Sequence, residues 1–421
     1  MKAIKNRKGN IVLFILVAVL VYLPFLKNFY VDYLGEDQID FPSYFVAANI
    51  AFNNEQSPYS NVNYERYEDN FERVFPYLYP PPSLLIFYPL SWYKYETASV
   101  LWLTFNHLLV LGALAIMLVF VLRYEHFQLV TLAFLVYLFN FQPLDTTLRL
   151  GQVNLLVLFS LLFFWFLYKR QKYPFLVSVP LVLAIILKVY PSLFLIFLLI
   201  KKEFQILKYI GISLGILLLL SILFLPLDIW HDYFVHVIPS GGYLKTHHDL
   251  FSPAAPWNQN INAFISRIFY PNQYSQVFFD NVLLGRVITY TLCIGVIVIS
   301  FLKLKKLSNY DNSSFAILLL TMFLIAPLSW EHHLVFILPV VFYLFLKLSI
   351  YKISIKVLIF LSLLVFAFNF PLEANTFKNG LLTLFISIKF FAVLLVWIIL
   401  IYNDKYLTLK TFKNKLFYEI P

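Results

Sequence analysis

Residues 169–202 read KRQKYPFLVSVPLVLAIILKVYPSLFLIFLLIKK, and this stretch indicates the fold class. Its apolar part, residues 174–200, would extend about 40 Å as one helix, which is longer than the ~30 Å hydrocarbon core of a bilayer. Basic clusters flank both ends, and basic residues favour the cytosolic side of a membrane. We therefore predict a hairpin of two short helices that turns at Lys188-Val-Tyr-Pro191 and places Lys188 in an outer cavity.

The composition of the whole chain agrees with a membrane environment. Of 421 residues, 61% are hydrophobic and 13% are charged, and the mean hydropathy is +0.77. A soluble domain is nearer half apolar and a quarter charged. This composition excludes a disordered or fibrous chain and argues against a nucleic-acid partner. The single cysteine, Cys293, allows neither an intramolecular disulfide nor a cysteine metal cluster.

Apolar runs long enough to cross or nearly cross a bilayer recur along the chain. We predict an all-α polytopic membrane protein, one domain over residues 1–421, with about 12 transmembrane helices. The runs lie at 10–28 (a retained first span), 97–122, 127–143, 152–168, 174–187, 191–200, 204–226, 284–302, 313–328, 334–350, 353–370 and 380–402. A shorter apolar stretch at 77–92 opens with prolines and is expected to be interfacial or re-entrant.

The charge distribution supports this topology. With twelve crossings both termini face the cytosol, and the cytosolic segments carry 21 Lys and Arg against five Asp and Glu. The rest of the chain carries 11 basic and 17 acidic residues, so the bias follows the positive-inside rule. Two long outer loops result, at about 29–96 and 227–283, and a short outer patch lies at 327–333. We expect the functional site where these three segments meet.

The first outer loop and the hairpin contain the charged candidates. Asp40 follows three other acidic residues and precedes an apolar stretch. A carboxylate at a membrane interface is partly desolvated, which raises its pKa towards a value useful for a general base; a solvated acidic loop or a helix cap is the alternative. A lysine near the bilayer is costly unless it is functional or paired. Lys188 is therefore a candidate phosphate counter-ion, or a side chain that reaches the outer headgroups.

Amides, aromatic residues and histidines supply the polar candidates. Gln152 and Asn154 begin an apolar run and could bind sugar hydroxyls or make interhelical hydrogen bonds. Adjacent histidines on a helix diverge by about 100°, so at most one of His332 and His333 should face a shared site. The second loop holds several His and Asp residues without an i, i+4 histidine pair. We therefore expect no tight zinc site, while a divalent metal beside a phosphate is possible but not required.

Five short motifs occur in one order along the chain. They are Asp40-Phe-Pro-Ser-Tyr44 with Ser57-Pro-Tyr59 and Tyr79-Pro80-Pro81, then Gly151-Gln152-Val-Asn154, Lys188-Val-Tyr-Pro191, Trp257-Asn-Gln-Asn260 and Pro327-Leu-Ser-Trp330-Glu-His-His333. Together they resemble the motifs of glycosyltransferase family 87, whose members use polyprenyl-phosphate sugars. Two positions depart from the family pattern: Asn260 stands where serine is usual, and Ala326 replaces the leading serine of the last motif.

The resemblance implies a C-type glycosyltransferase fold in the cell membrane, with an active site facing the exoplasm. It implies transfer of a hexose, with mannose favoured, from a polyprenyl-phosphate carrier to a glycolipid or cell-envelope glycan. By the same matching, Asp40 is the base and one of the two histidines lines the site. We expect Lys188, Arg149, His332 and His333 to hold the donor phosphate, and the sugar or acceptor to contact Tyr44, Tyr59, Tyr79, Gln152, Asn154, Trp257, Asn258, Asn260 and Trp330.

Other functions use the same residues differently. A flippase or transporter of a lipid-linked or charged solute would handle a charged headgroup without bond chemistry. The long, aromatic-rich outer loops favour the transferase, because transporters place their binding groups near the midplane on broken helices. A non-catalytic scaffold subunit would tolerate replacement of Asp40 and Lys188. A ligase or polymerase would keep the fold but transfer a whole glycan.

Overall fold

The computed structural model describes residues 16–27, 38–60, 74–120, 127–247 and 250–402. These residues are predominantly helical, and their β pairing consists of two isolated bridges, one joining His247 to Phe251 and the other joining Asn258 to Trp330. The prediction of an all-α protein is confirmed for the described residues. Asp32, Glu36, Asp37, His248 and Asp249 lie outside them.

Each of the predicted apolar runs is helical over most of the part that the structure describes. The first half contains a helix at Leu16–Lys27, α2 (Phe41–Phe52), η2 (Pro81–Ser83), α4 (Leu84–Phe87), η3 (Tyr88–Trp92), α5 (Tyr95–Val119), α6 (Phe127–Phe139), α7 (Gln142–Arg149), α8 (Asn154–Lys169), α9 (Pro174–Leu187), η4 (Tyr190–Ser192), α10 (Leu193–Ile200) and α11 (Phe204–Phe224). The predicted interfacial stretch 77–92 thus forms short helical turns, η2 to η3, which pack beside α2.

The second half begins with short helices and continues with longer ones. It contains α12 (Leu227–Asp232), η5 (Tyr233–Val237), α13 (Ile238–Ser240), α14 (Ile261–Phe269), α15 (Val282–Lys306), α16 (Asn312–Ile325), η6 (Glu331–Ile337), α17 (Leu338–Lys347), η7 (Leu348–Ile350), α18 (Ile353–Ala367), η8 (Asn375–Phe377), η9 (Gly380–Ser387) and α19 (Ile388–Tyr402). Side-chain caps start several of these helices; Asn281, for example, accepts a hydrogen bond from the Leu284 N–H at 3.0 Å at the start of α15.

Several helices are long and apolar enough to cross a membrane. Among the described residues there are five, at Tyr95–Val119, Phe204–Phe224, Val282–Lys306, Glu331–Ile350 and Gly380–Tyr402, and α6 with α7 makes a sixth if this pair, bent by 48°, counts as one span. Seven more apolar helices have 10–17 residues. The structure therefore supports a multi-pass membrane protein, and the number of about twelve crossings stays a prediction.

The segment that suggested a hairpin does turn back on itself. α9 ends at Leu187, and Lys188 is extended with φ −146° and ψ 128°. The Tyr168 hydroxyl, which precedes the segment, donates to the Glu203 carboxylate, which follows it, at 3.0 Å. Because residues on either side of the segment touch, α9 and α10 form the predicted hairpin and Lys188 lies at its tip.

Basic residues collect at the other end of this hairpin. The Lys201 ammonium donates to the carbonyls of Leu304 and Leu307 at 2.7 and 2.6 Å, and Lys169 donates to the side-chain oxygen of Asn312 at 2.7 Å. We call this region the basic end. Lysines that bind terminal helix carbonyls also complement the negative end of the helix dipole.

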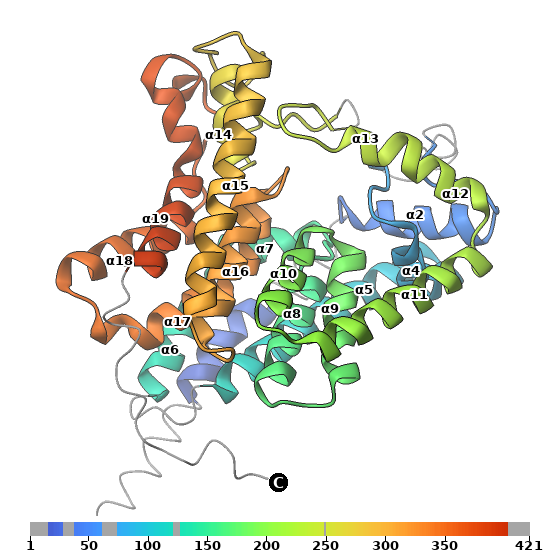
Figure 1. Cartoon of the computed structure of the whole chain (residues 1–421), viewed down its shortest axis with the longest axis horizontal. Coiled ribbons are helices and arrows are strands. Elements are labelled where there is room, and N and C mark those ends of the chain that lie inside the picture. Colours follow the sequence, from blue (N-terminus) through green and yellow to red (C-terminus); the bar gives the residue numbers. More distant parts are fainter. Residues whose placement is uncertain (1–15, 28–37, 61–73, 121–126, 248–249, 403–421) are drawn as a thin grey trace, which may run out of the picture.

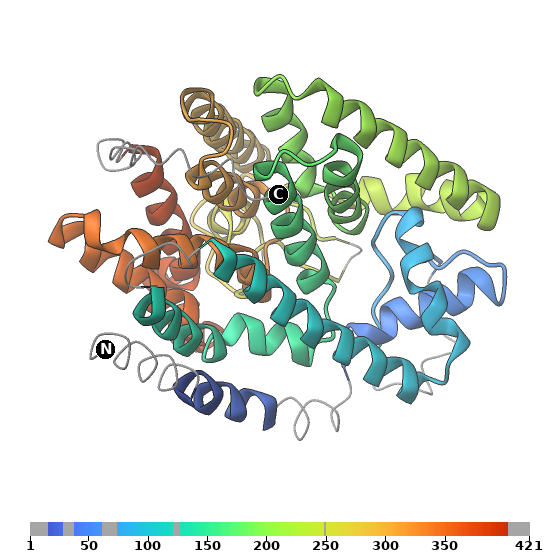
Figure 2. The ribbon, with the colours of Figure 1, turned by 90° about the horizontal axis from the view of Figure 1, so that it is seen from below.

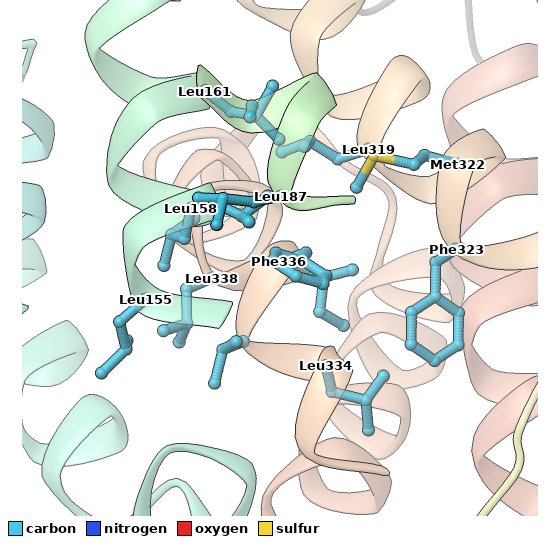
Figure 3. Close-up of a cluster of buried hydrophobic side chains, with 14 of the residues drawn as sticks. Leu155, Leu158, Leu161, Leu187, Leu319, Met322, Phe323, Leu334, Phe336 and Leu338 are labelled. Atoms are coloured by element: carbon cyan, nitrogen blue, oxygen red, sulfur yellow. The ribbon is translucent and has the colours of Figure 1, made fainter. Parts of the chain in front are cut away.

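The helices pack around α8, which contacts α5, α9 and η6. Figure 1 shows α14, α15, α16 and α19 on one side of the molecule and α2, α4, α11 and α12 on the other. Seen from below, the helix at Leu16–Lys27 lies along one edge and α11 along the opposite edge (Figure 2). Between them, Leu155, Leu158 and Leu161 of α8 belong to a buried cluster with Leu187 and Leu338 (Figure 3). This apolar core fixes where α9 ends relative to α8.

Candidate active site

Asp40 is held through both its backbone and its side chain. Its N–H donates to the Leu150 carbonyl at 2.9 Å, and its carboxylate accepts from the Gln152 amide at 2.6 Å. It precedes α2, yet its side chain makes no capping hydrogen bond to that helix. The carboxylate is therefore not a helix cap, and it faces the turn between α7 and α8.

Gly151 makes the close approach of this turn to α2 possible. Its φ is +67°, a conformation that glycine adopts without steric cost. A Cβ at this position would lie 2.8 Å from the Cβ of Phe41 and would clash with the side chain of Gln38. The glycine therefore lets Gln152 reach Asp40.

Three tyrosines are linked in a chain of hydrogen bonds that starts at Gln152. The Tyr44 hydroxyl donates to the Gln152 side-chain oxygen at 3.0 Å and lies 3.1 Å from the Tyr79 hydroxyl. The Tyr59 hydroxyl donates to the Tyr79 carbonyl at 2.5 Å. Since Tyr44 occupies the amide oxygen, the Gln152 N–H₂ group must point at Asp40, and the donor orientation is set by the network.

Lys188 meets a histidine from the third outer segment. Its Nζ lies 2.8 Å from Nε2 of His333, and the Trp330 backbone N–H lies 3.3 Å from Nδ1 of the same ring. A charged ammonium can only donate, so it requires a bare Nε2 and a proton on Nδ1. The Trp330 N–H can donate only to an unprotonated Nδ1, which places the His333 proton on Nε2. The Trp330 and Lys188 contacts therefore coexist only when Lys188 is neutral and accepts that proton in a hydrogen bond.

Burial tunes the two charged groups in opposite directions. Burial raises the pKa of Asp40 to about 6, although the hydrogen bond from Gln152 and the charge of Lys188 both lower it. Burial also lowers the pKa of Lys188 to about 7, although the charge of Asp40 raises it. Both side chains keep some accessible surface. Near pH 6.5 the site therefore holds a carboxylate of unusual basicity and an ammonium poised to lose its proton.

The predicted residues of the second outer loop form a separate group beside this site. Trp257 stacks on Trp330 with ring centroids 5.8 Å apart. The Asn258 side chain accepts from the Ser329 N–H at 2.8 Å and donates to the Pro253 carbonyl at 2.9 Å. Asn260 caps α14 through the Ala263 N–H at 2.8 Å and donates to the Ala326 carbonyl at 2.7 Å. Both asparagines are fully buried and join the second loop to the third segment.

Two arginines are also engaged within the protein. Arg149 binds Asp145 one helical turn away at 3.0 Å, and both side chains are more than a third exposed. Arg267 is buried and donates to Ser387 and to several carbonyls of the second loop, including those of Ala255 and Asn258 at 2.6 Å each. Through these hydrogen bonds Arg267 fixes the shape of this loop.

The sequence did not reveal two further groups at the site. Glu331, which precedes the histidines, forms a buried ion pair with Lys389 of α19 at 3.0 Å, and its N–H donates to the Trp257 carbonyl at 2.8 Å. Tyr190 packs against His333 with ring centroids 6.4 Å apart. Lys389 lies inside an apolar run, and a lysine in such a run indicates a buried partner or a functional role.

Within residues 16–27, 38–60, 74–120, 127–247 and 250–402, no three His, Cys, Asp or Glu side chains lie close enough to hold an ion. Two of the second-loop residues weighed for this role, His248 and Asp249, lie outside those ranges.

Fold and site together define the class of the protein. It is a helical, multi-pass membrane protein in which a partly buried Asp and Lys lie among tyrosines and histidines, where the predicted outer segments meet. Within this class, the chain belongs to glycosyltransferase family 87, whose model matches residues 77–328, more than half of its length. The match contains Gln152, Asn154 and Lys188 and ends before His332 and His333. Neither the curated proteins nor the solved structures gave a match.

Proposed function

We propose that this glycosyltransferase moves a hexose, with mannose favoured, from a polyprenyl-phosphate carrier to a glycolipid or cell-envelope glycan. The proposal is supported most by one observation, the buried Asp40 carboxylate held by Gln152 within electrostatic reach of Lys188. Such a transfer needs a base for the acceptor hydroxyl and a positive charge that stabilises the leaving phosphate.

Asp40 acts as the general base of an inverting displacement. The acceptor hydroxyl gives its proton to the Asp40 carboxylate while its oxygen bonds to the anomeric carbon. The bond from that carbon to the phosphate oxygen breaks on the opposite face, and the electron pair leaves with the lipid phosphate. A phosphate is already a good leaving group, so one carboxylate suffices where a typical glycosidase uses two.

Lys188 stabilises the charge that develops on the leaving phosphate. An ammonium in a water-poor site acts more strongly than in bulk water. His333 orients this ammonium by accepting its hydrogen bond at Nε2, in the tautomer that carries its proton on Nδ1 and gives up the Trp330 contact. Arg149 lies on α7, which packs against η6, the segment that carries His332. A divalent metal is not required in this scheme.

The orientation follows from the charge distribution. The basic end lies in the cytosol by the positive-inside rule, so the site at the hairpin tip faces the exoplasm. The protein then resides in the cell membrane with both termini cytosolic, and its lipid-linked donor arrives from the bilayer.

Transfer of labelled sugar from polyprenyl-phosphate-mannose by the purified protein tests this proposal. Asp40→Asn keeps the size of the side chain and should reduce transfer at least a hundredfold, the usual contribution of a positioned base. Asp228→Asn, at an exposed position on α12, is the matched control. Equal transfer by wild type and Asp40→Asn would remove Asp40 from the reaction. Movement of donor across vesicles without any transfer would favour the flippase.

A further inference from the structure

Asn154 is an exception to the rule that buried amides are hydrogen-bonded. It is the first residue of α8 and is fully buried. Within the described residues, neither its amide nitrogen nor its amide oxygen has a hydrogen-bond partner. Leaving such a group unpaired costs stability, so an orphan amide in this position calls for an explanation. By contrast, both ends of the Gln152 amide are occupied.

The position of Asn154 places it beside the phosphate-binding lysine. Residues four apart share one face of a helix, so Asn154 lies one turn from Leu158 towards the start of α8. Leu158 of α8 and Leu187 of α9 belong to the same buried cluster (Figure 3), and the two helices pack against each other. Lys188 directly follows Leu187. The segment η6, which carries His333, also packs against α8. Asn154 therefore lies at the wall shared by the hairpin tip and the histidine segment.

Two more orphan atoms lie around the same wall. The Tyr190 hydroxyl and Nε2 of His332 are buried and have no hydrogen-bond partner in the described part of the chain. The Lys188 Nζ lies 5.7 Å from the centroid of the Tyr190 ring. Three segments distant in sequence thus carry buried polar atoms without a partner among the described residues, and the side chains of Tyr190 and His332 lie within electrostatic reach of Lys188.

The orphan atoms also indicate what the ligand must offer. The Asn154 amide has free donors on nitrogen and a free acceptor on oxygen. A phosphate accepts hydrogen bonds only, so it would leave the amide oxygen unpaired. A hydroxyl both donates and accepts, and two neighbouring hydroxyls of a sugar ring can pair with both ends of one amide. The chemistry at Asn154 therefore fits a sugar and that at Lys188 fits the phosphate.

We propose that Asn154 and the Tyr190 hydroxyl form the subsite that binds hydroxyl groups of the sugar being transferred. This inference rests on the proposed function, because it places a phosphate at Lys188 and the attached sugar next to it. The subsite determines which sugars bind productively, since a site that pairs with substrate hydroxyls discriminates against analogues lacking them.

Binding without turnover tests the subsite. The affinity of the full-length purified protein is measured for polyprenyl phosphate and for polyprenyl phosphate bearing mannose, glucose or arabinose. For wild type, at least one sugar should tighten binding relative to the bare phosphate. Asn154→Leu should lose about tenfold or more of that gain, the effect of one or two hydrogen bonds. Tyr190→Phe, which removes one hydroxyl, should lose part of it.

Stability supplies an independent readout. Asn154→Leu replaces an unpaired amide by an apolar group of similar shape, so the unliganded melting temperature should stay equal or rise. Ser160→Ala is the matched control, since Ser160 is another buried residue of α8 whose hydroxyl has no partner among the described residues. It should keep the full sugar-dependent gain in affinity.

Clear results would overturn the subsite. One is that the sugar tightens binding equally in wild type and in Asn154→Leu. Another is that none of the three sugars tightens binding in wild type. A third is that Asn154→Leu has a lower unliganded melting temperature while Tyr190→Phe keeps the full sugar-dependent gain in affinity. Transfer by wild type and Asp40→Asn is measured separately. A wild type that binds the sugar through Asn154 but transfers nothing would contradict the proposed function and leave the subsite standing.

Discussion

Replacement of Gln152 by leucine should change the pH dependence of transfer in a calculable way. The Gln152 amide donates to the Asp40 carboxylate at 2.6 Å, and this contact lowers the pKa of Asp40 against the effect of burial. A hydrogen bond to a charged group contributes about 1.5–3 kcal/mol. Since 1.36 kcal/mol corresponds to one pKa unit, its loss should raise the pKa of Asp40 from about 6 to about 7–8.

The sign of the effect on activity follows from the role of Asp40 as a base. A base works when it is ionised, so the acidic limb of kcat/KM should move to higher pH. At pH 6 the ionised fraction should fall about 5- to 50-fold for this change in pKa. Lys188 loses its charge near pH 7 and sets the alkaline limb of the same profile. The acidic and alkaline limbs should therefore overlap, and the maximal kcat/KM should fall. Asp40 and Lys188 interact, so the pKa values read from the two limbs belong to the pair and not to either residue alone.

The assay is the initial rate of sugar transfer by purified wild type and Gln152→Leu between pH 5 and 9. Gln142→Leu, an amide on α7 that bonds Thr146 rather than Asp40, is the control and should keep the wild-type profile. An acidic limb that stays in place in Gln152→Leu, with activity lowered equally at every pH, would refute the electrostatic role of Gln152.

Three other substitutions test separate parts of the structure. Lys188→Arg keeps its charge at alkaline pH, so the alkaline limb of the transfer profile should disappear while the acidic limb remains; a persistent alkaline limb would assign it to another group. Gly151→Ala imposes a strained φ and a clash with Phe41, so thermal unfolding should show a lower melting temperature and transfer should fall, and an unchanged melting temperature would contradict the packing argument. Glu331→Gln and Lys389→Met should each destabilise by about 3–5 kcal/mol, but the double variant by less than their sum; additive losses in denaturant unfolding would show that the ion pair contributes no coupling.

The features that could be predicted from sequence depend on local pattern. Apolar runs give helices because a chain in lipid must satisfy its own backbone hydrogen bonds. The hairpin follows from the length of residues 174–200 and the basic residues that flank it. Asp40 and Lys188 stand out because charged groups beside apolar runs are costly without a function or a partner.

The features that could not be predicted depend on partners distant in sequence. Gln152 lies 112 residues from Asp40, and Lys389 lies 58 residues from Glu331. No pattern in the neighbouring sequence predicts either the Gln152–Asp40 contact or the Lys389–Glu331 contact. The predictions for Asn258 and Asn260 met the same difficulty, because an amide suited to a sugar is equally suited to backbone groups of a neighbouring loop. Their hydrogen bonds to such groups leave their predicted contact with sugar a prediction.

The order of synthesis also constrains how this protein matures. The second outer loop folds around Arg267, which donates to Ser387 at 2.6 Å, 120 residues further along the chain. The segment that carries His332 and His333 is anchored through Glu331 to Lys389. Ser387 ends η9 and Lys389 is the second residue of α19, so both partners are made only when synthesis reaches the junction of these two helices. Before then, Arg267 can pair with the carbonyls of its own loop, whereas Glu331 lacks the Lys389 ammonium that pairs with it. The segment that carries the two histidines is therefore anchored only late in synthesis.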